Sequence, residues 1–299
     1  MSRRTFGIAL LCGSMLATTH SFAAGSCMRD ALQAATDSYI TAQTKGDPSV
    51  MKLASPVKYM EQLKDADIKT GILSSAQKID FSRSFLDADQ CETFTEVIIT
   101  DPKHPYVLGT RLKLDGGKVS EINSLVTDEG DWLFNAANDF KWSPQEDWGV
   151  IPKDKQGTRE SLMAAANAYF DYFSDKNVKV PWGTPCNRLE GGLRTGKGTP
   201  DDTCNVGVPN GIKFPDRRYV VDVDHGAVDI LVRFGGSEVG LPDSHLFRIE
   251  NGKIRFVHTI TVCDQPNCGF PPPKGQFPSQ SGAKPGGAAV QPADKPKQP

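Results

Sequence analysis

The sequence has almost no excess charge of either sign, because 34 basic residues nearly balance 36 acidic residues and the formal net charge is -2. A protein that binds nucleic acid usually carries a basic patch, so this balance argues against a nucleic-acid partner. Mean hydropathy is also low, at -0.38. The sequence has no apolar run of the roughly 20 residues that a membrane-spanning helix needs. We therefore expect no stable membrane insertion.

Several motifs of well-known catalytic and cofactor sites are also missing. The sequence contains neither the GxSxG of serine hydrolases nor the HExxH of zinc peptidases. The glycine-rich stretch "GGLRTGKG" is not a phosphate-binding loop, because Lys197 is followed by Gly198 instead of serine or threonine. "CDQPNC" has no second short-spaced cysteine pair to complete a zinc site. We expect no organic cofactor and no resident metal.

The first residues, "MSRRTFGIALLCGSMLATTHSFAAGS", have the three parts of an export signal. Two arginines precede an apolar stretch from Gly7 to Ala17, and small residues then suit cleavage after Ala23 or Ala24. We predict a signal peptide over residues 1–24 and a periplasmic or secreted protein. "SRRTF" resembles the twin-arginine export motif, although an ordinary secretory route fits the same leader. At the other end, residues 265–299 are rich in proline, glycine, serine and lysine, which predicts a disordered tail.

Six cysteines remain once the predicted leader is removed, and an even number in an exported chain favours disulfides. Six cysteines permit about 15 pairings. We expect the two local pairs, Cys186–Cys204 and Cys263–Cys268, which leaves Cys27–Cys91.

The sequence repeats itself at a long interval. "RDALQAATDSY" from Arg29 matches "RESLMAAANAY" from Arg159, and "RSFLDAD" matches "RRYVVDVD", so that Asp87 corresponds to Asp222. Further on, "LKLDGGKVSEINSLVT" matches "FRIENGKIRFVHTITV". These matches occur in the same order, which is the signature of a duplicated unit. Each copy opens with a helical pattern and continues with strands joined by hairpins, so the predicted fold class is α+β.

The domain boundaries follow from this repeat. We predict a first unit over 27–140, a linker over 141–158 and a second unit over 159–264. The two units are expected to pack on each other or on a second chain.

The order of helix and curved antiparallel sheet resembles the nuclear-transport-factor-2-like, or SnoaL-like, cone. The second copy is similar to an uncharacterised family of exported fungal and bacterial proteins of that kind. The resemblance covers residues 160–263 and depends on "PCNRLEGG", "TCNVGVPNG", "RRYVVD" and "GLPDSHLFRIENGKIRFVHTITVC". It implies a cone that encloses a pocket. Such cones include dehydratases, isomerases, epoxide hydrolases and non-catalytic binding modules, so the fold does not choose among these functions.

The last of these stretches contains two histidines. Asn251-Gly252 is the strongest short-range signal of a two-residue hairpin turn. Counted outward from that turn, His245 faces His258 on the apolar side of the hairpin. The two imidazoles then act as general acid and base, share a metal with a third ligand, or are hydrogen-bonded core residues.

Other polar residues are candidates for the same pocket. Asp222, in the middle of "YVVDVD", either orients a histidine as part of the catalytic group or is a structural acceptor common to both copies. Arg188 either binds an anionic substrate or pairs with a nearby carboxylate. Glu190, Asp243 and Tyr169 complete the expected substrate-binding residues.

These candidates support two functions. The first is a cofactor-independent lyase, isomerase or hydrolase that acts on a small organic molecule through His258, His245 and Asp222. The alternative is a non-catalytic module of the cell envelope that binds a small molecule or a protein.

Overall fold

The computed structural model describes residues 27–236 and 240–271. The predicted leader and the part of the predicted tail over 272–299 lie outside these ranges. The first unit consists of α1 (Arg29–Lys45), β1 (Leu53–Glu61), β2 (Lys64–Asp65), β3 (Phe81–Asp87), β4 (Glu92–Ile99), β5 (Tyr106–Asp115) and β6 (Lys118–Thr127), with short 3-10 turns η1 (Pro48–Val50) and η2 (Ile72–Ser74). The second unit consists of α3 (Arg159–Asp171), β7 (Trp182–Glu190), β8 (Leu193–Arg194), β9 (Arg218–Asp222), β10 (Ala227–Phe234), β11 (Leu241–Glu250), β12 (Lys253–Thr261) and η5 (Pro266–Gly269).

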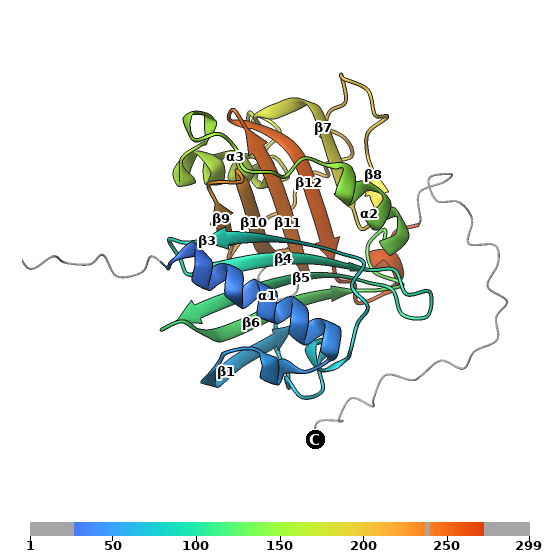
Figure 1. The fold of residues 1–299 in the computed structure, drawn as a ribbon. Coiled ribbons are helices and arrows are strands. Elements are labelled where there is room, and N and C mark those ends of the chain that lie inside the picture. Colours follow the sequence, from blue (N-terminus) through green and yellow to red (C-terminus); the bar gives the residue numbers. More distant parts are fainter. Residues whose placement is uncertain (1–26, 237–239, 272–299) are drawn as a thin grey trace, which may run out of the picture.

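The two units have the same sheet topology. The strand order is β2-β1-β6-β5-β4-β3 in the first sheet and β8-β7-β12-β11-β10-β9 in the second. The predicted α+β fold and the tandem units are therefore confirmed (Figure 1). One detail of the predicted antiparallel sheets is wrong, because β1 pairs with β6 and β7 pairs with β12 in parallel. No hairpin joins the strands of these pairs, so the turn signals in the sequence do not define their direction.

A helix covers one face of each sheet. In α1 the apolar side chains of Leu32, Tyr39 and Ala42 are buried, and in α3 those of Leu162 and Tyr169 are buried. These positions follow the helical repeat that the sequence shows. Thr158 caps α3 by accepting a hydrogen bond from the Ser161 amide, and Gly46 ends α1 with a φ of 64°.

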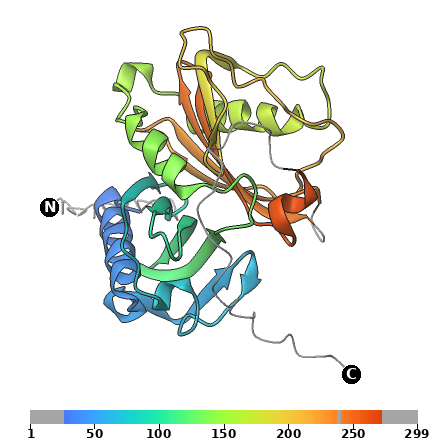
Figure 2. The same cartoon turned by 90° about the vertical axis from the view of Figure 1, so that its right-hand side faces the viewer.

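The opposite faces of the two sheets pack against each other, so that the units form two touching lobes (Figures 1 and 2). Buried apolar side chains from both sheets form this interface, including Phe85, Phe94, Val220 and Leu246. Between the two sheets the chain forms α2 (Ala136–Trp142), which begins within the predicted first unit, and then η3 (Ser143–Gln145) and η4 (Lys153–Lys155) of the predicted linker. Its Trp148 is buried in the same cluster. The linker is therefore part of the packed interface.

Two reciprocal ion pairs join the edges of the sheets. Arg29 of α1 donates to both carboxylate oxygens of Asp222, at 2.9 and 3.0 Å, and Arg159 of α3 donates to Asp87 at 2.7 Å. Each aspartate also accepts a backbone amide from the other unit, because Leu86 N donates to Asp222 and Val221 N donates to Asp87. The two residues that correspond in the sequence repeat therefore make equivalent contacts across the interface.

The three expected disulfides are confirmed: Cys27–Cys91, Cys186–Cys204 and Cys263–Cys268. The last pair changes one predicted boundary. The predicted tail begins at residue 265, but η5 follows that position directly, and the disulfide ties it to Cys263, two residues after β12. In the part of the chain that the structure describes, no helix is long and apolar enough to cross a membrane.

Candidate functional site

The predicted pairing of the two histidines is wrong by one residue. The turn at Asn251-Gly252 forms as expected, with φ values of 50° and 70°, and Ile249 pairs with Ile254. Beyond that pair, a β-bulge at Arg255 adds one residue to β12, so His245 pairs with Thr259. A shift of one residue turns each following side chain to the opposite face of the sheet. His245 therefore faces α3 whereas His258 faces the first unit, and the two imidazoles cannot share a proton path or a metal.

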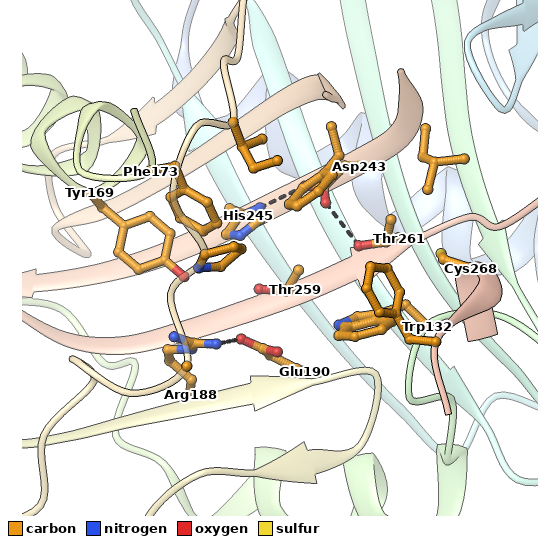
Figure 3. A pocket seen from close by; sticks show the side chains of 16 residues that line it. Trp132, Tyr169, Phe173, Arg188, Glu190, Asp243, His245, Thr259, Thr261 and Cys268 are labelled. Atoms are coloured by element: carbon orange, nitrogen blue, oxygen red, sulfur yellow. Dashed lines mark hydrogen bonds and ion pairs between the residues drawn. The ribbon is translucent and has the colours of Figure 1, made fainter. Parts of the chain in front are cut away.

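A cavity of about 320 Å³ lies beside His245 in the second unit. This volume is within the range of small-molecule sites. Figure 3 shows that side chains from α3, β7, β11 and β12 converge on it. Most of its wall is aromatic or aliphatic, formed by Trp132, Phe173, Ile212, Phe234, Leu241 and Phe270. The polar side chains that line it are Tyr169, Arg188, Glu190, Asp243, His245, Thr259 and Thr261. Five of the seven predicted site residues are therefore brought together here.

His245 is held by a buried carboxylate. Its Nδ1 lies 2.6 Å from Oδ1 of Asp243, two residues earlier on the same face of β11, and Thr261 donates to the other oxygen of Asp243 at 2.8 Å. His245 is 2% exposed and Asp243 is fully buried. A neutral imidazole that donates from Nδ1 to a carboxylate presents Nε2 as a proton acceptor. The contact with Asp243 thus fixes the orientation of the His245 ring.

Two hydroxyl groups at the cavity lack partners among the described residues. The phenol of Tyr169 and the side-chain oxygen of Thr259 are buried and make no hydrogen bond within residues 27–236 and 240–271. Burial raises the pKa of Tyr169, so the phenol keeps its proton and remains a donor. A buried polar group without a partner costs about 1–3 kcal/mol, which is recovered when a ligand provides the missing hydrogen bond.

The corresponding tyrosine of the first unit has a different environment. Tyr39 bonds to Thr110 at 2.7 Å, and Thr110 occupies the position of His245 in the repeat. Leu73 of η2 is buried in the same core cluster as Tyr39, and Ile72 N donates to Glu61 at 2.6 Å. Tyr39 thus has a hydrogen-bond partner in the first unit, whereas Tyr169 has none among the described residues.

Arg188 is neutralised within the wall of the cavity. Its guanidinium forms an ion pair with Glu190, two residues along β7, and donates to the carbonyl oxygens of Val206 at 2.6 Å and Cys204 at 3.4 Å. Of the two roles expected for Arg188, pairing with a nearby carboxylate is the one that the structure shows. The Arg188–Glu190 pair adds no net charge to the cavity.

His258 lies between the two units, away from the cavity. Its Nδ1 is 2.8 Å from Glu96 of β4, and its Nε2 is 2.6 Å from Glu146 of the linker. Burial by itself lowers the pKa of His258, but the two carboxylates outweigh burial and raise the pKa to about 10. The imidazolium thus joins the second unit to the first unit and to the linker, and the predicted catalytic role of His258 is not supported by this position.

Asp222 also lies at the interface. Burial by itself raises the pKa of this carboxyl, but hydrogen bonds from His225 and Arg29 outweigh burial and lower the pKa to about 2. Of the two roles expected for Asp222, the structural acceptor common to both copies is the one that the contacts show. Asp222 does not line the cavity, and the histidine that it contacts is His225, whereas the carboxylate beside His245 is that of Asp243.

Sequence reasoning did not identify several residues of the cavity. Thr259 and Thr261 were missed because the bulge at Arg255 was not anticipated. Trp132 belongs to the segment between β6 and α2, and Phe270 belongs to the predicted tail. No local motif marks either aromatic residue, since both reach the cavity through the packing of distant parts of the chain.

Comparisons with known proteins assign no activity to this fold. Residues 155–261 match a family model described as a domain of unknown function (DUF8021). The match begins just before α3 and ends with β12, so it spans the unit that contains the cavity. No curated protein matches the chain.

Proposed function

We propose that the second unit carries out cofactor-independent acid–base chemistry on a small, partly apolar organic molecule, as a lyase, isomerase or hydrolase. This proposal is supported above all by the Asp243–His245 pair. Oδ1 of Asp243 lies 2.6 Å from Nδ1 of His245, and both residues line a cavity of about 320 Å³. A positioned histidine is the commonest general acid or base in enzymes. The aromatic wall supports a partly apolar ligand.

The roles of the polar groups follow from their hydrogen bonds and their positions at the cavity. Nε2 of His245 accepts a proton from the substrate, and Asp243 stabilises the imidazolium that forms. The phenol of Tyr169 donates a hydrogen bond to a substrate oxygen that gains negative charge in the transition state. The proton then returns from Nε2 to another atom of the substrate or to the leaving group. This sequence of steps needs no electron acceptor and no metal ion.

The similarity to the SnoaL-like cone belongs to the same proposal. Each unit has a helix across a curved sheet, which is the arrangement that the resemblance implies. Export is also part of the proposal, and three disulfides support it because such bonds persist in oxidising compartments.

A base-catalysed ring opening provides the test. The probe is 5-nitrobenzisoxazole, an uncharged bicyclic molecule that eliminates to a coloured nitrophenolate when a base removes one proton. We expect the full chain to accelerate this elimination and the His245→Gln variant to be slower by about 100-fold or more. Asp243→Asn also slows the reaction, because the imidazole loses the partner that orients it. His104→Gln, at an exposed histidine, is the matched control and keeps the full rate.

Two outcomes contradict the proposed chemistry. The first is that His245→Gln catalyses the elimination as fast as the native protein does. The second is binding of the probe, measured by calorimetry, without any acceleration. The second outcome instead favours a non-catalytic binding module of the cell envelope.

A further inference from the structure

We infer that the first unit completes the site of the second, with Trp132 as a specificity-determining residue that selects uncharged, ring-bearing ligands. This inference depends on the proposed function, because it takes the ligand to bind beside His245. It goes further by naming the ligand class and by giving the first unit a part in binding.

Trp132 reaches the cavity from outside the second unit. It lies in residues 128–135, which connect β6 of the first unit to α2. Its indole contacts the ring of Phe270 edge to face, with centroids 5.5 Å apart and an angle of 78°. Both rings line the cavity, and Figure 3 shows Trp132 across the cavity from Tyr169. Aromatic surfaces in this arrangement offer a planar ring both face and edge contacts.

The segment that carries Trp132 is hydrogen-bonded to residues 262–270, the segment that follows β12. The amide of Asn267 donates to Gly130 O at 2.6 Å, and its side-chain oxygen accepts from Leu133 N at 2.9 Å. The amide of Cys263 donates to Asp131 at 2.6 Å. The Cys263–Cys268 disulfide closes a short loop within residues 262–270. The indole is therefore positioned by bonds on both sides of its own residue.

A second anchor joins the same segment to the turn between β7 and β8. Asn135 N donates to Gly191 O, next to Glu190 of the cavity wall. Gly191 has a φ of 54°, and a Cβ atom there would clash with the carbonyl oxygen of Trp132. Only glycine permits this approach of the two backbones. The first unit is thus fitted to the second at the cavity itself.

The charges around the cavity favour an uncharged ligand. The charge of Arg188 is offset by Glu190, and its Nη1 donates to two carbonyl oxygens, while its Nε has no partner among the described residues. The carboxylate of Asp243 is bonded to His245 and Thr261. Among the described residues that line the cavity, Arg188 is the only lysine or arginine, and its charge is offset by Glu190. An anionic ligand would therefore lose its hydration without gaining a free cation.

Three probes of similar size test this selection. 2-Naphthol is uncharged and aromatic, 2-decalol has the same skeleton with saturated rings, and 2-naphthoate is aromatic and anionic. Calorimetric titration of the full chain is expected to give the tightest binding for 2-naphthol. Trp132→Ala weakens that binding by about tenfold, whereas Trp132→Phe, which keeps an aromatic face, weakens it much less. Trp142→Ala is the matched control, because this tryptophan lies in α2 and contacts Lys141 and Arg194 outside the cavity.

Each contrary result overturns the inference. The first is that the native chain and Trp132→Ala bind 2-naphthol with equal affinity. The second is that the native chain binds 2-naphthoate or 2-decalol as tightly as 2-naphthol, or more tightly. The third is that 2-naphthol does not bind at all. Thermal unfolding of each variant shows whether the fold is retained, and Trp132→Phe keeps the comparison valid if Trp132→Ala unfolds. Binding of 2-naphthol needs no proton transfer, so it succeeds or fails independently of the elimination assay with His245→Gln.

Discussion

Replacement of His258 by glutamine should destabilise the protein strongly, and by an amount that depends on pH. The imidazolium lies between the carboxylates of Glu96 and Glu146 and is 4% exposed. Arg83 lies 3.5 Å from Glu96, and the buried Asp139 and Asp229 also interact with this carboxylate. Removing one partner from a buried set of charges costs about 3–5 kcal/mol, because the remaining charges are left without compensation.

The pKa of His258 provides a second measure of the same quantity. The pKa is about 10 in the folded chain, against 6.5 for an unperturbed histidine. Each unit of pKa difference is worth about 1.4 kcal/mol, so the folded state gains about 5 kcal/mol from this group while it is protonated in both states. Because the folded pKa is the higher one, this stability is fully present below about pH 6.5 and is lost as the pH rises toward about 10.

Urea unfolding of the native chain and of His258→Gln at several pH values measures this effect. We expect the variant to be less stable by about 3–5 kcal/mol near pH 6, and the difference to shrink by about 1.4 kcal/mol per pH unit above pH 6.5. His104→Gln, at an exposed position, is the control and should keep the native pH dependence. If His258→Gln and the native chain lose stability in parallel as the pH rises, His258 is not the charged link between the units. If the variant does not fold, the decrease in the unfolding free energy of the native chain with rising pH still tests the role of His258.

The remaining predictions concern the interface, the two equivalent tyrosines and one disulfide. Asp222→Asn should lower the free energy of unfolding by about 1–3 kcal/mol, because the variant loses the ion pair with its arginine partner; unchanged urea unfolding would contradict this. Tyr169→Phe should slow the elimination assay with little loss of stability, since its hydroxyl has no partner in the described chain, whereas Tyr39→Phe should lower the melting temperature by losing the bond to a threonine. Double replacement of Cys27 and Cys91 by serine should cost about 2–5 kcal/mol in thermal or urea unfolding, because this disulfide closes a long loop of the first unit; a stability equal to the native chain would refute it.

Much of the fold follows from the sequence because its signals are local or repeated. The helices at Arg29 and Arg159 show a 3.6-residue apolar pattern that survives in the structure as the buried faces of α1 and α3. The Asn251-Gly252 turn has the backbone conformation that its residues favour. The repeat predicts two units, and the two sheets have the same strand order.

The register of the central hairpin was not predictable in the same way. Both faces of β12 are buried, one against α3 and the other against the first unit, so apolar residues do not alternate cleanly along it. Phe256 and Val257 are both apolar, and they face opposite clusters. The pattern therefore gave no sign of the bulge that turns His258 away from the cavity.

By itself, the sequence determined the α+β class and the duplication, and it predicted the three disulfides and most polar residues of the candidate site, because these depend on composition, spacing or short-range geometry, except that Cys27–Cys91 was the pair left over. Only the tertiary structure decided which histidine faces the cavity, which carboxylate orients it, and that Trp132 of the first unit forms part of the wall. The physical reason is that these facts depend on one extra residue in a doubly buried strand and on contacts between segments more than a hundred residues apart, such as His258 with Glu146 and Asn267 with Leu133.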